Sequence, residues 1–174
     1  MTFNEINVIT LNPVMAAGIK VRPEEDYNHV IYQAAHHMFL ASAKAVKLGH
    51  EINPDFKIGM MMLYPTFYAE TCHPLDQLKA LEAVDQHYIF SDVQVRGKYS
   101  KKATSFLERL GVTIQKEVDD EKILKEGTVD YIGFSYYNSN VASHDMDKET
   151  TVGNMLNAIK NPYLKASDWG WAID

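Results

Sequence analysis

The amino-acid sequence predicts an α/β fold in which parallel strands are joined by crossover helices. Short runs of apolar and β-branched residues alternate with longer segments whose apolar residues recur every three or four positions. The predicted order is strand, helix, strand, helix pair, strand, which is typical of parallel sheets. This order leaves open whether the sheet is doubly wound or part of a barrel. The sequence contains no GxGxxG or GxxxxGK turn, which disfavours a nucleotide-binding sheet.

Composition narrows the class of protein. The chain has 174 residues, of which 46% are hydrophobic and 23% charged, so it can bury a globular core. The net charge of −6 comes without a sustained basic tract, which argues against nucleic acid as a partner. Cys72 is the one cysteine, so a reducing, cytoplasmic setting is expected. The apolar runs are too short to cross a bilayer, and no membrane partner is expected.

The first third of the chain is predicted to hold a strand end, a loop and a long helix. Residues 2–6, TFNEI, are typical of the end of a buried strand. The following segment, up to residue 28, is predicted as a loop because Pro13 and Pro23 interrupt it. From residue 29 to 48, apolar residues at three- and four-residue steps predict a helix that stops at Gly49.

The middle of the chain predicts one strand and two helices. Residues 57–64, KIGMMMLY, are a continuous apolar run short enough to be a strand covered on both faces. A helix is expected from Pro74, with one apolar side made of Leu75, Leu78, Leu81, Val84 and Tyr88. Ser100 is a suitable N-cap for a further helix, which would end at Gly111.

A last strand is predicted over residues 128–139, after a short helical turn at 119–127. Its period of two places one set of side chains on the pocket side, namely Tyr131, Gly133, Ser135 and Tyr137. The other set is expected to lie beneath helices, namely Ile132, Phe134 and Tyr136. A helix at about 152–159 and a loop over 161–174 complete the prediction.

Polar residues end the first and the last predicted strand. Asn4 and Glu5 end the first, and Ser135 and Tyr137 end the last. Because reactive groups of parallel α/β proteins sit at the carboxyl ends of strands, both ends are expected to face one pocket. In a regular strand Asn4 and Glu5 would point to opposite faces. Both can reach one site only if the strand kinks or ends there.

These residues carry a family resemblance. The segment TFNEIN resembles the Thr-Phe-Asn-Glu signature of glycoside hydrolase family 1, and Ile-Asn after the Glu is similar to its bacterial 6-phospho-β-glucosidases. Five further segments are similar to that branch in order and spacing, among them YAETCHPLDQL, FSDVQVRGKYS and SDWGWAID. The resemblance implies a partial TIM (β/α)8 barrel, about strands 4 to 6 with their helices. It also implies that residues 1–174 form a single incomplete domain.

The resemblance assigns roles to four residues. Glu5 would be the catalytic general acid/base, and Asn4 would hold the sugar 2-hydroxyl. Tyr137 matches a tyrosine that hydrogen-bonds the nucleophilic carboxylate. Ser135 stands where many members carry Asn and would make a polar contact with the sugar. The family's nucleophile lies in a Glu-Asn-Gly strand, and this sequence contains no such tripeptide.

Three functions follow from the resemblance. The first is hydrolysis of 6-phospho-β-glucosides in the cytoplasm, with a phosphorylated β-glucoside as substrate and no cofactor or metal. The second is a catalytically silent remnant that acts by association with a complementary polypeptide. The third is hydrolysis of non-phosphorylated β-glucosides. Open strand edges predict self-association or pairing with the missing barrel segments.

Other reactive residues have plainer expected roles. His36 and His37 are expected to be packed or capping rather than metal-binding, because adjacent helical residues point in different directions. Cys72 has no evident basic partner and is expected to be an inert thiol. For Trp169 and Trp171, stacking on a sugar and ordinary packing are expected equally.

Overall fold

The computed structural model of this chain describes residues 1–145, 147 and 159–174. They form two compact units, of which the first holds residues 1–63 and 88–135 and the second residues 64–87 and 136–174. The helix predicted near 152–159 lies outside the described residues except for Ile159, whose N–H donates to Val141 O. The single incomplete domain expected over the whole chain stays a prediction.

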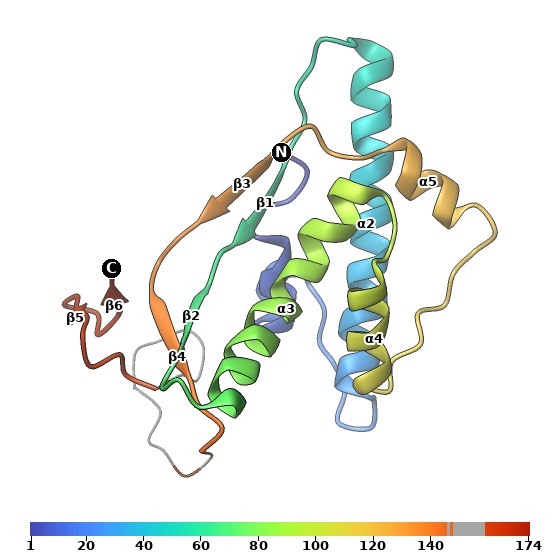
Figure 1. The fold of residues 1–174 in the computed structure, drawn as a ribbon. Coiled ribbons are helices and arrows are strands. Elements are labelled where there is room, and N and C mark those ends of the chain that lie inside the picture. The colour runs from blue at the N-terminus through green and yellow to red at the C-terminus, as the bar shows by residue number, and fades with distance from the viewer. Residues whose placement is uncertain (146, 148–158) are drawn as a thin grey trace. The chain divides into compact units, whose positions relative to one another are not determined.

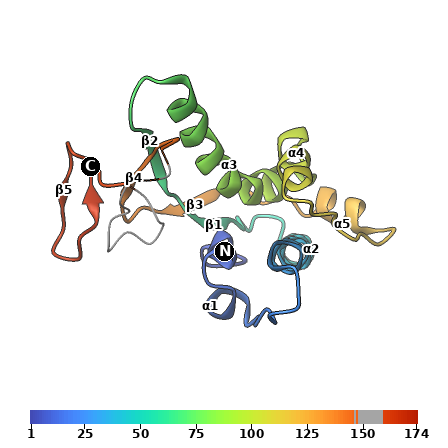
Figure 2. The ribbon, with the colours of Figure 1, turned by 90° about the horizontal axis from the view of Figure 1, so that it is seen from below.

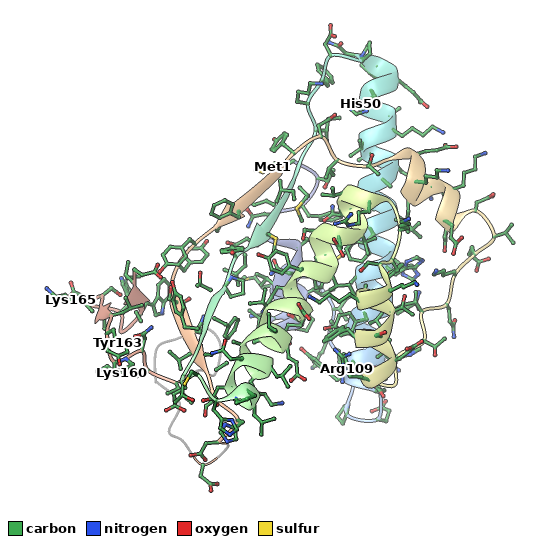
Figure 3. The ribbon with its side chains drawn as sticks, in the orientation of Figure 1. Met1, His50, Arg109, Lys160, Tyr163 and Lys165 are labelled. Carbon is green, nitrogen blue, oxygen red and sulfur yellow. The ribbon has the colours of Figure 1, made fainter. Side chains whose placement is uncertain are left out.

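The first unit contains the parallel sheet that the sequence predicts. Strand β1 (Met60–Leu63) pairs in parallel with β3 (Ile132–Ser135), and Figure 1 shows the two strands side by side. The register places Leu63 opposite Ser135. The N-terminal segment runs along the other edge of β1, since Thr2 N–H donates to Gly59 O, and Figure 3 shows Met1 beside these strands.

Two of the predicted helices in the first unit pack against each other with closely approaching backbones. Helix α2 (Tyr27–Ile52) begins at the N-cap Asp26, whose side chain accepts from His29 N–H. Helix α5 (Asp120–Glu126) packs against α2 and ends at Gly127. A Cβ atom at Gly127 would lie 2.1 Å from Ala43 O, so only glycine permits this approach.

The predicted cap of the third helix is confirmed. Helix α4 (Lys101–Arg109) starts after Ser100, whose hydroxyl accepts from Ala103 N–H. The chain leaves the helix through Gly111 at φ 70°, a conformation that favours glycine.

The strand end predicted over residues 2–6 is not a strand in the structure, and the loop predicted after it is wrong in part. Residues Ile6–Thr10 form a 3-10 helix, η1, and Pro13–Ala17 form the short helix α1. Local signals explain α1, because Pro13 occupies its first turn and the Asn12 side chain caps it. Burial explains η1, which packs against β1, α1 and α2; Figure 2 shows this N-terminal region beside α2.

The second unit holds strands that the sequence analysis missed. Strand β2 (Thr66–Ala69) pairs in parallel with β4 (Ser139–Ala142). The strand predicted over 128–139 contains the shorter β3 and ends at the first residue of β4, which the prediction missed. The predicted C-terminal loop contains a short antiparallel pair, β5 (Lys165–Ala166) with β6 (Ala172–Ile173). These strands have two to four residues, too few for a clear periodic pattern.

Helix α3 (Pro74–Arg96) begins where predicted, but its expected apolar side is not its buried side. Leu75, Leu78 and Leu81 are 48%, 53% and 59% exposed. The buried residues of the helix are a mixed set: Asp76, Ala80, His87, Ile89, Phe90, Ser91, Val93 and Gln94. Helical spacing identifies a face, whereas burial depends on what packs against it.

The apolar side of β3 is a second correction of the same kind. Ile132 and Phe134 were expected beneath helices, yet they are 47% and 64% exposed. Among the described elements, β1 is the main packing partner of β3, and β1 covers its edge rather than its faces.

Within the described residues, no helix is long and apolar enough to cross a membrane.

Candidate active site

The N-terminal segment turns abruptly at Glu5. Glu5 lies at φ 46° and ψ 54°, and among the described residues it is the one non-glycine with a positive φ. A left-handed backbone costs an L-residue about 1–2 kcal/mol, and such strain gathers at functional sites. The backbone turns at Glu5 and continues as η1, so Asn4 and Glu5 do not lie in a regular strand; that both reach one site stays a prediction.

The Glu5 side chain is half-buried and incompletely paired. Its Oε1 atom is buried and has no hydrogen-bond partner among the described residues. A buried polar atom without a partner costs about 1–3 kcal/mol and calls for an explanation. A role in proton transfer is one such explanation, because the hydrogen-bond partner of a general acid/base arrives only with the substrate. Asn4 beside it is exposed.

A side-chain amide ties the turn after Glu5 to the end of β1. Asn7 Nδ2 donates to Leu63 O, and Leu63 N–H donates to Asn7 Oδ1, both at 2.8 Å. Asn7 is fully buried. Sequence reasoning did not single out Asn7, and its partner lies 56 residues away, so no local pattern could have indicated the contact.

Three of the four predicted site residues, Asn4, Glu5 and Ser135, belong to the first unit. The N-terminal segment meets β1 at Gly59 and again at Leu63, so both run in the same direction. β3 runs parallel to β1 and ends at Ser135, opposite Leu63. Ser135 thus lies at the carboxyl end of β3, where reactive groups of such folds are found, and its placing relative to Asn4 and Glu5 stays a prediction.

Tyr137 belongs to the second unit and is described within it. It is 36% exposed, and its ring meets the ring of Trp171 edge-on at a centroid distance of 5.9 Å. Trp171 therefore takes part in packing, whereas Trp169 is 81% exposed. The placing of Tyr137 relative to Glu5 stays a prediction.

The second unit also contains a hydrogen-bonded cluster around one carboxylate, which sequence reasoning missed. Asp174 accepts hydrogen bonds from the Tyr68 and Tyr136 hydroxyls. These bonds hold the pKa of the Asp174 carboxyl below its usual value. The Tyr136 hydroxyl also contacts Ser139 Oγ at 3.0 Å. The three segments lie far apart in the sequence, so only the fold reveals the cluster.

His36 is a packed histidine, as expected. It is fully buried, with Nδ1 3.0 Å from the Tyr99 hydroxyl and Nε2 3.0 Å from Asp120 Oδ2. Hydrogen bonding to His36 lowers the pKa of Asp120, and burial raises the pKa of Tyr99. In the part of the chain that the structure describes, no three His, Cys, Asp or Glu residues are placed to hold a metal ion.

Comparison with known protein families shows which family this chain belongs to. A model described as glycosyl hydrolase family 1 matches residues 1–174. The chain belongs to glycosyl hydrolase family 1. Within this family, an aryl-phospho-β-D-glucosidase of Bacillus subtilis is 48% identical to the chain. The 6-phospho-β-glucosidases of Clostridium longisporum and Escherichia coli are 45% and 43% identical. Each alignment covers 100% of this chain and 37% of the relative, so the chain spans little more than a third of these relatives.

Solved family 1 structures share the fold. A family 1 β-glucosidase from Thermotoga maritima matches with a TM-score of 0.74 at 21% identity, covering 100% of this chain and 37% of the other. A β-glucosidase from Exiguobacterium marinum matches with a TM-score of 0.69 at 18% identity, covering 97% of this chain and 37% of the other. The described residues form no closed barrel, so the predicted partial barrel is confirmed.

Proposed function

We propose that this chain is part of a retaining 6-phospho-β-glucosidase and that Glu5 is its general acid/base. The observation that carries the proposal is the strained, half-buried Glu5, whose Oε1 is buried and unpaired among the described residues and which lies directly before the 3-10 helix η1. Family membership supports it, as do relatives whose names specify phosphorylated β-glucosides at 43–48% identity.

The proposed reaction is a double displacement. Glu5 donates its proton to the leaving glycosidic oxygen while a second carboxylate attacks the anomeric carbon and forms a covalent glycosyl intermediate. Glu5 then takes a proton from water, and the resulting hydroxide displaces the carboxylate and releases the sugar. Asn4 is proposed to hold the 2-hydroxyl, Ser135 to contact the sugar and Tyr137 to hydrogen-bond the attacking carboxylate.

The second carboxylate decides what the isolated chain can do. Retaining glycosidases need their two carboxyl groups about 5–5.5 Å apart. The sequence contains no Glu-Asn-Gly tripeptide, which is where the family resemblance places the nucleophile. We therefore expect catalysis to require polypeptide beyond these 174 residues. A silent remnant that pairs with a complementary polypeptide is the second candidate, and the solvent-exposed Phe134 on β3 favours it.

The test assays two preparations with a chromogenic 6-phospho-β-glucoside and with the plain glucoside. One is the purified chain, and the other is the Bacillus subtilis relative with residues 1–174 grafted in place of its aligned segment. We expect no turnover from the isolated chain and turnover of the phosphorylated substrate by the graft. Glu5→Gln should lower kcat of the graft by about 10²–10⁴-fold, whereas the loop variant Glu24→Gln should not.

Other outcomes separate the candidates. A folded graft whose activity is unchanged by Glu5→Gln would contradict the acid/base role. Equal turnover of plain glucosides would favour the β-glucosidase alternative. A folded graft without any turnover would favour the silent remnant.

We propose a cytoplasmic location for this function, because the single Cys72 is exposed and unpaired with another cysteine.

A further inference from the structure

We propose that Asn7 is a positioning residue that holds Glu5 in its left-handed turn at the end of β1. This inference rests on the proposed role of Glu5 for its catalytic meaning, but the conformational claim stands on contacts within the first unit. Asn7 would act through Glu5 and is not itself proposed to touch the substrate.

The Asn7 amide takes the place of a neighbouring strand. It donates to Leu63 O and accepts from Leu63 N–H, so it uses both hydrogen-bonding groups of the last residue of β1. Two bonds of opposite direction fix both the distance and the rotation of the amide. Full burial removes competition from water, so breaking the pair would leave the Leu63 groups unpaired inside the protein.

The spacing of the anchors explains why the chain turns between them. The anchor points beside the N-terminal segment are Gly59, directly before β1, and Leu63 at its end; they are four residues apart, which is about 13 Å in a strand. On the N-terminal segment the anchors are Thr2 and Asn7, five residues apart. The surplus residue cannot stay extended over the same length, and a local kink takes it up, as in a β-bulge.

Short-range bonds place the kink at Glu5. Val8 N–H donates to Glu5 O at 2.8 Å, and Thr10 Oγ1 donates to Asn7 O at 2.9 Å. These bonds close η1 directly after Glu5, and the buried Ile6 separates Glu5 from Asn7. Without the Asn7 anchor, Glu5 is expected to relax to a negative φ, because the left-handed region is unfavourable for a residue with a Cβ atom.

The test reads the Glu5 backbone directly by NMR of the full 174-residue chain. The three-bond HN–Hα coupling and the Cα shift of Glu5 report its φ. We expect a left-handed signature in the wild type, its loss in Asn7→Ala, and its retention in Asn140→Ala. Asn140 is the matched control, because it is a fully buried asparagine of the second unit that donates to Thr66 O. A general loss of stability would affect both variants alike.

Asn7→Asp supplies a rescue experiment. An ionised Asp can accept from Leu63 N–H but cannot donate to Leu63 O, whereas a protonated Asp can do both. We therefore expect the Glu5 signature to be lost at neutral pH and recovered on acidification, each measured against the wild type at the same pH. This variant also decides the matter if Asn7→Ala does not fold.

Two results would overturn the inference: a left-handed Glu5 in folded Asn7→Ala, or a Glu5 signature in Asn7→Asp that pH leaves unchanged. None of these readouts needs turnover. An inactive graft would therefore contradict the proposed function without touching the role of Asn7.

Discussion

The carboxylate of Asp76 joins the start of α3 to the end of β4 through His144. Asp76 Oδ1 accepts from His144 Nδ1 at 2.6 Å and from the His144 backbone N–H at 2.9 Å. The Thr71 hydroxyl donates to the other oxygen. Asp76 is 1% exposed, and these hydrogen bonds, that from Thr71 first, hold its pKa well below the usual range.

This pairing predicts an acid-sensitive contribution to stability. A depressed pKa in the folded state stabilises the protein above the ordinary Asp value and loses that contribution as the pH falls below it. Asp76→Asn should therefore lower the free energy of unfolding at pH 7 and flatten its decline below about pH 4. Urea unfolding at a series of pH values measures both effects. The exposed Asp55→Asn should show neither, and an unchanged acid limb in Asp76→Asn would refute the assignment.

His87 predicts a separate effect at higher pH. Burial lowers its pKa to about 4, and its ring stacks on Phe67. Since the unfolded chain binds the proton more readily, the stabilisation is complete above about pH 6.5 and is lost as the pH falls towards 4, by at most about 3 kcal/mol. His87→Gln should remove this slope between pH 6.5 and 4. The exposed His37→Gln is the control, and an equal slope in both variants would count against a buried neutral His87.

Glu5 predicts a conflict between stability and function. Glycine tolerates φ 46° and carries no carboxylate to bury, so Glu5→Gly should raise the free energy of unfolding by about 1 kcal/mol despite the greater freedom of the unfolded chain. Glu5→Ala separates the two causes, because it removes the carboxylate but keeps the strained backbone. Thermal unfolding of the three proteins tests this. A Glu5→Gly protein less stable than Glu5→Ala would show that the turn carries no strain.

The exposed side of β3 predicts association. Phe134 is 64% exposed, and one edge of β3 is paired with no strand among the described residues. We expect the chain to be marginally stable as a monomer and to self-associate. Phe134→Lys should weaken that association by about tenfold in sedimentation velocity, or about 1.4 kcal/mol. Val118→Lys changes a residue that is 98% exposed and should have no effect. A wild-type chain that remains monomeric at high concentration would contradict the prediction.

The helices were the most predictable part of the fold, because their signals are local. Ser100 caps α4 and Pro74 opens α3, as their positions in the sequence indicate. The strands were less predictable. The strand at 57–64 is confirmed through β1, yet β2 and β4 escaped detection because four-residue strands pair with segments some seventy residues away.

The residues of the candidate site were predictable from the sequence, whereas their geometry was not. The predicted strand ends singled out Asn4, Glu5, Ser135 and Tyr137, and the family resemblance assigned their roles. It did not reveal the left-handed turn at Glu5, the unpaired Oε1 atom or the Asn7 anchor. Each of these depends on contacts across the first unit that no local pattern contains.

The amino-acid sequence by itself determined the α/β class, the starts of helices α3 and α4, the family and the acidic residue proposed for catalysis. These follow from periodicity, capping and a short motif, which act over a few residues. The sequence did not determine the end of α2, which continues through Gly49 to Ile52. The tertiary structure decided which helix faces are buried and how Glu5 is held. Burial and the two Asn7–Leu63 hydrogen bonds join residues distant in the chain, and such contacts exist only once the chain has folded.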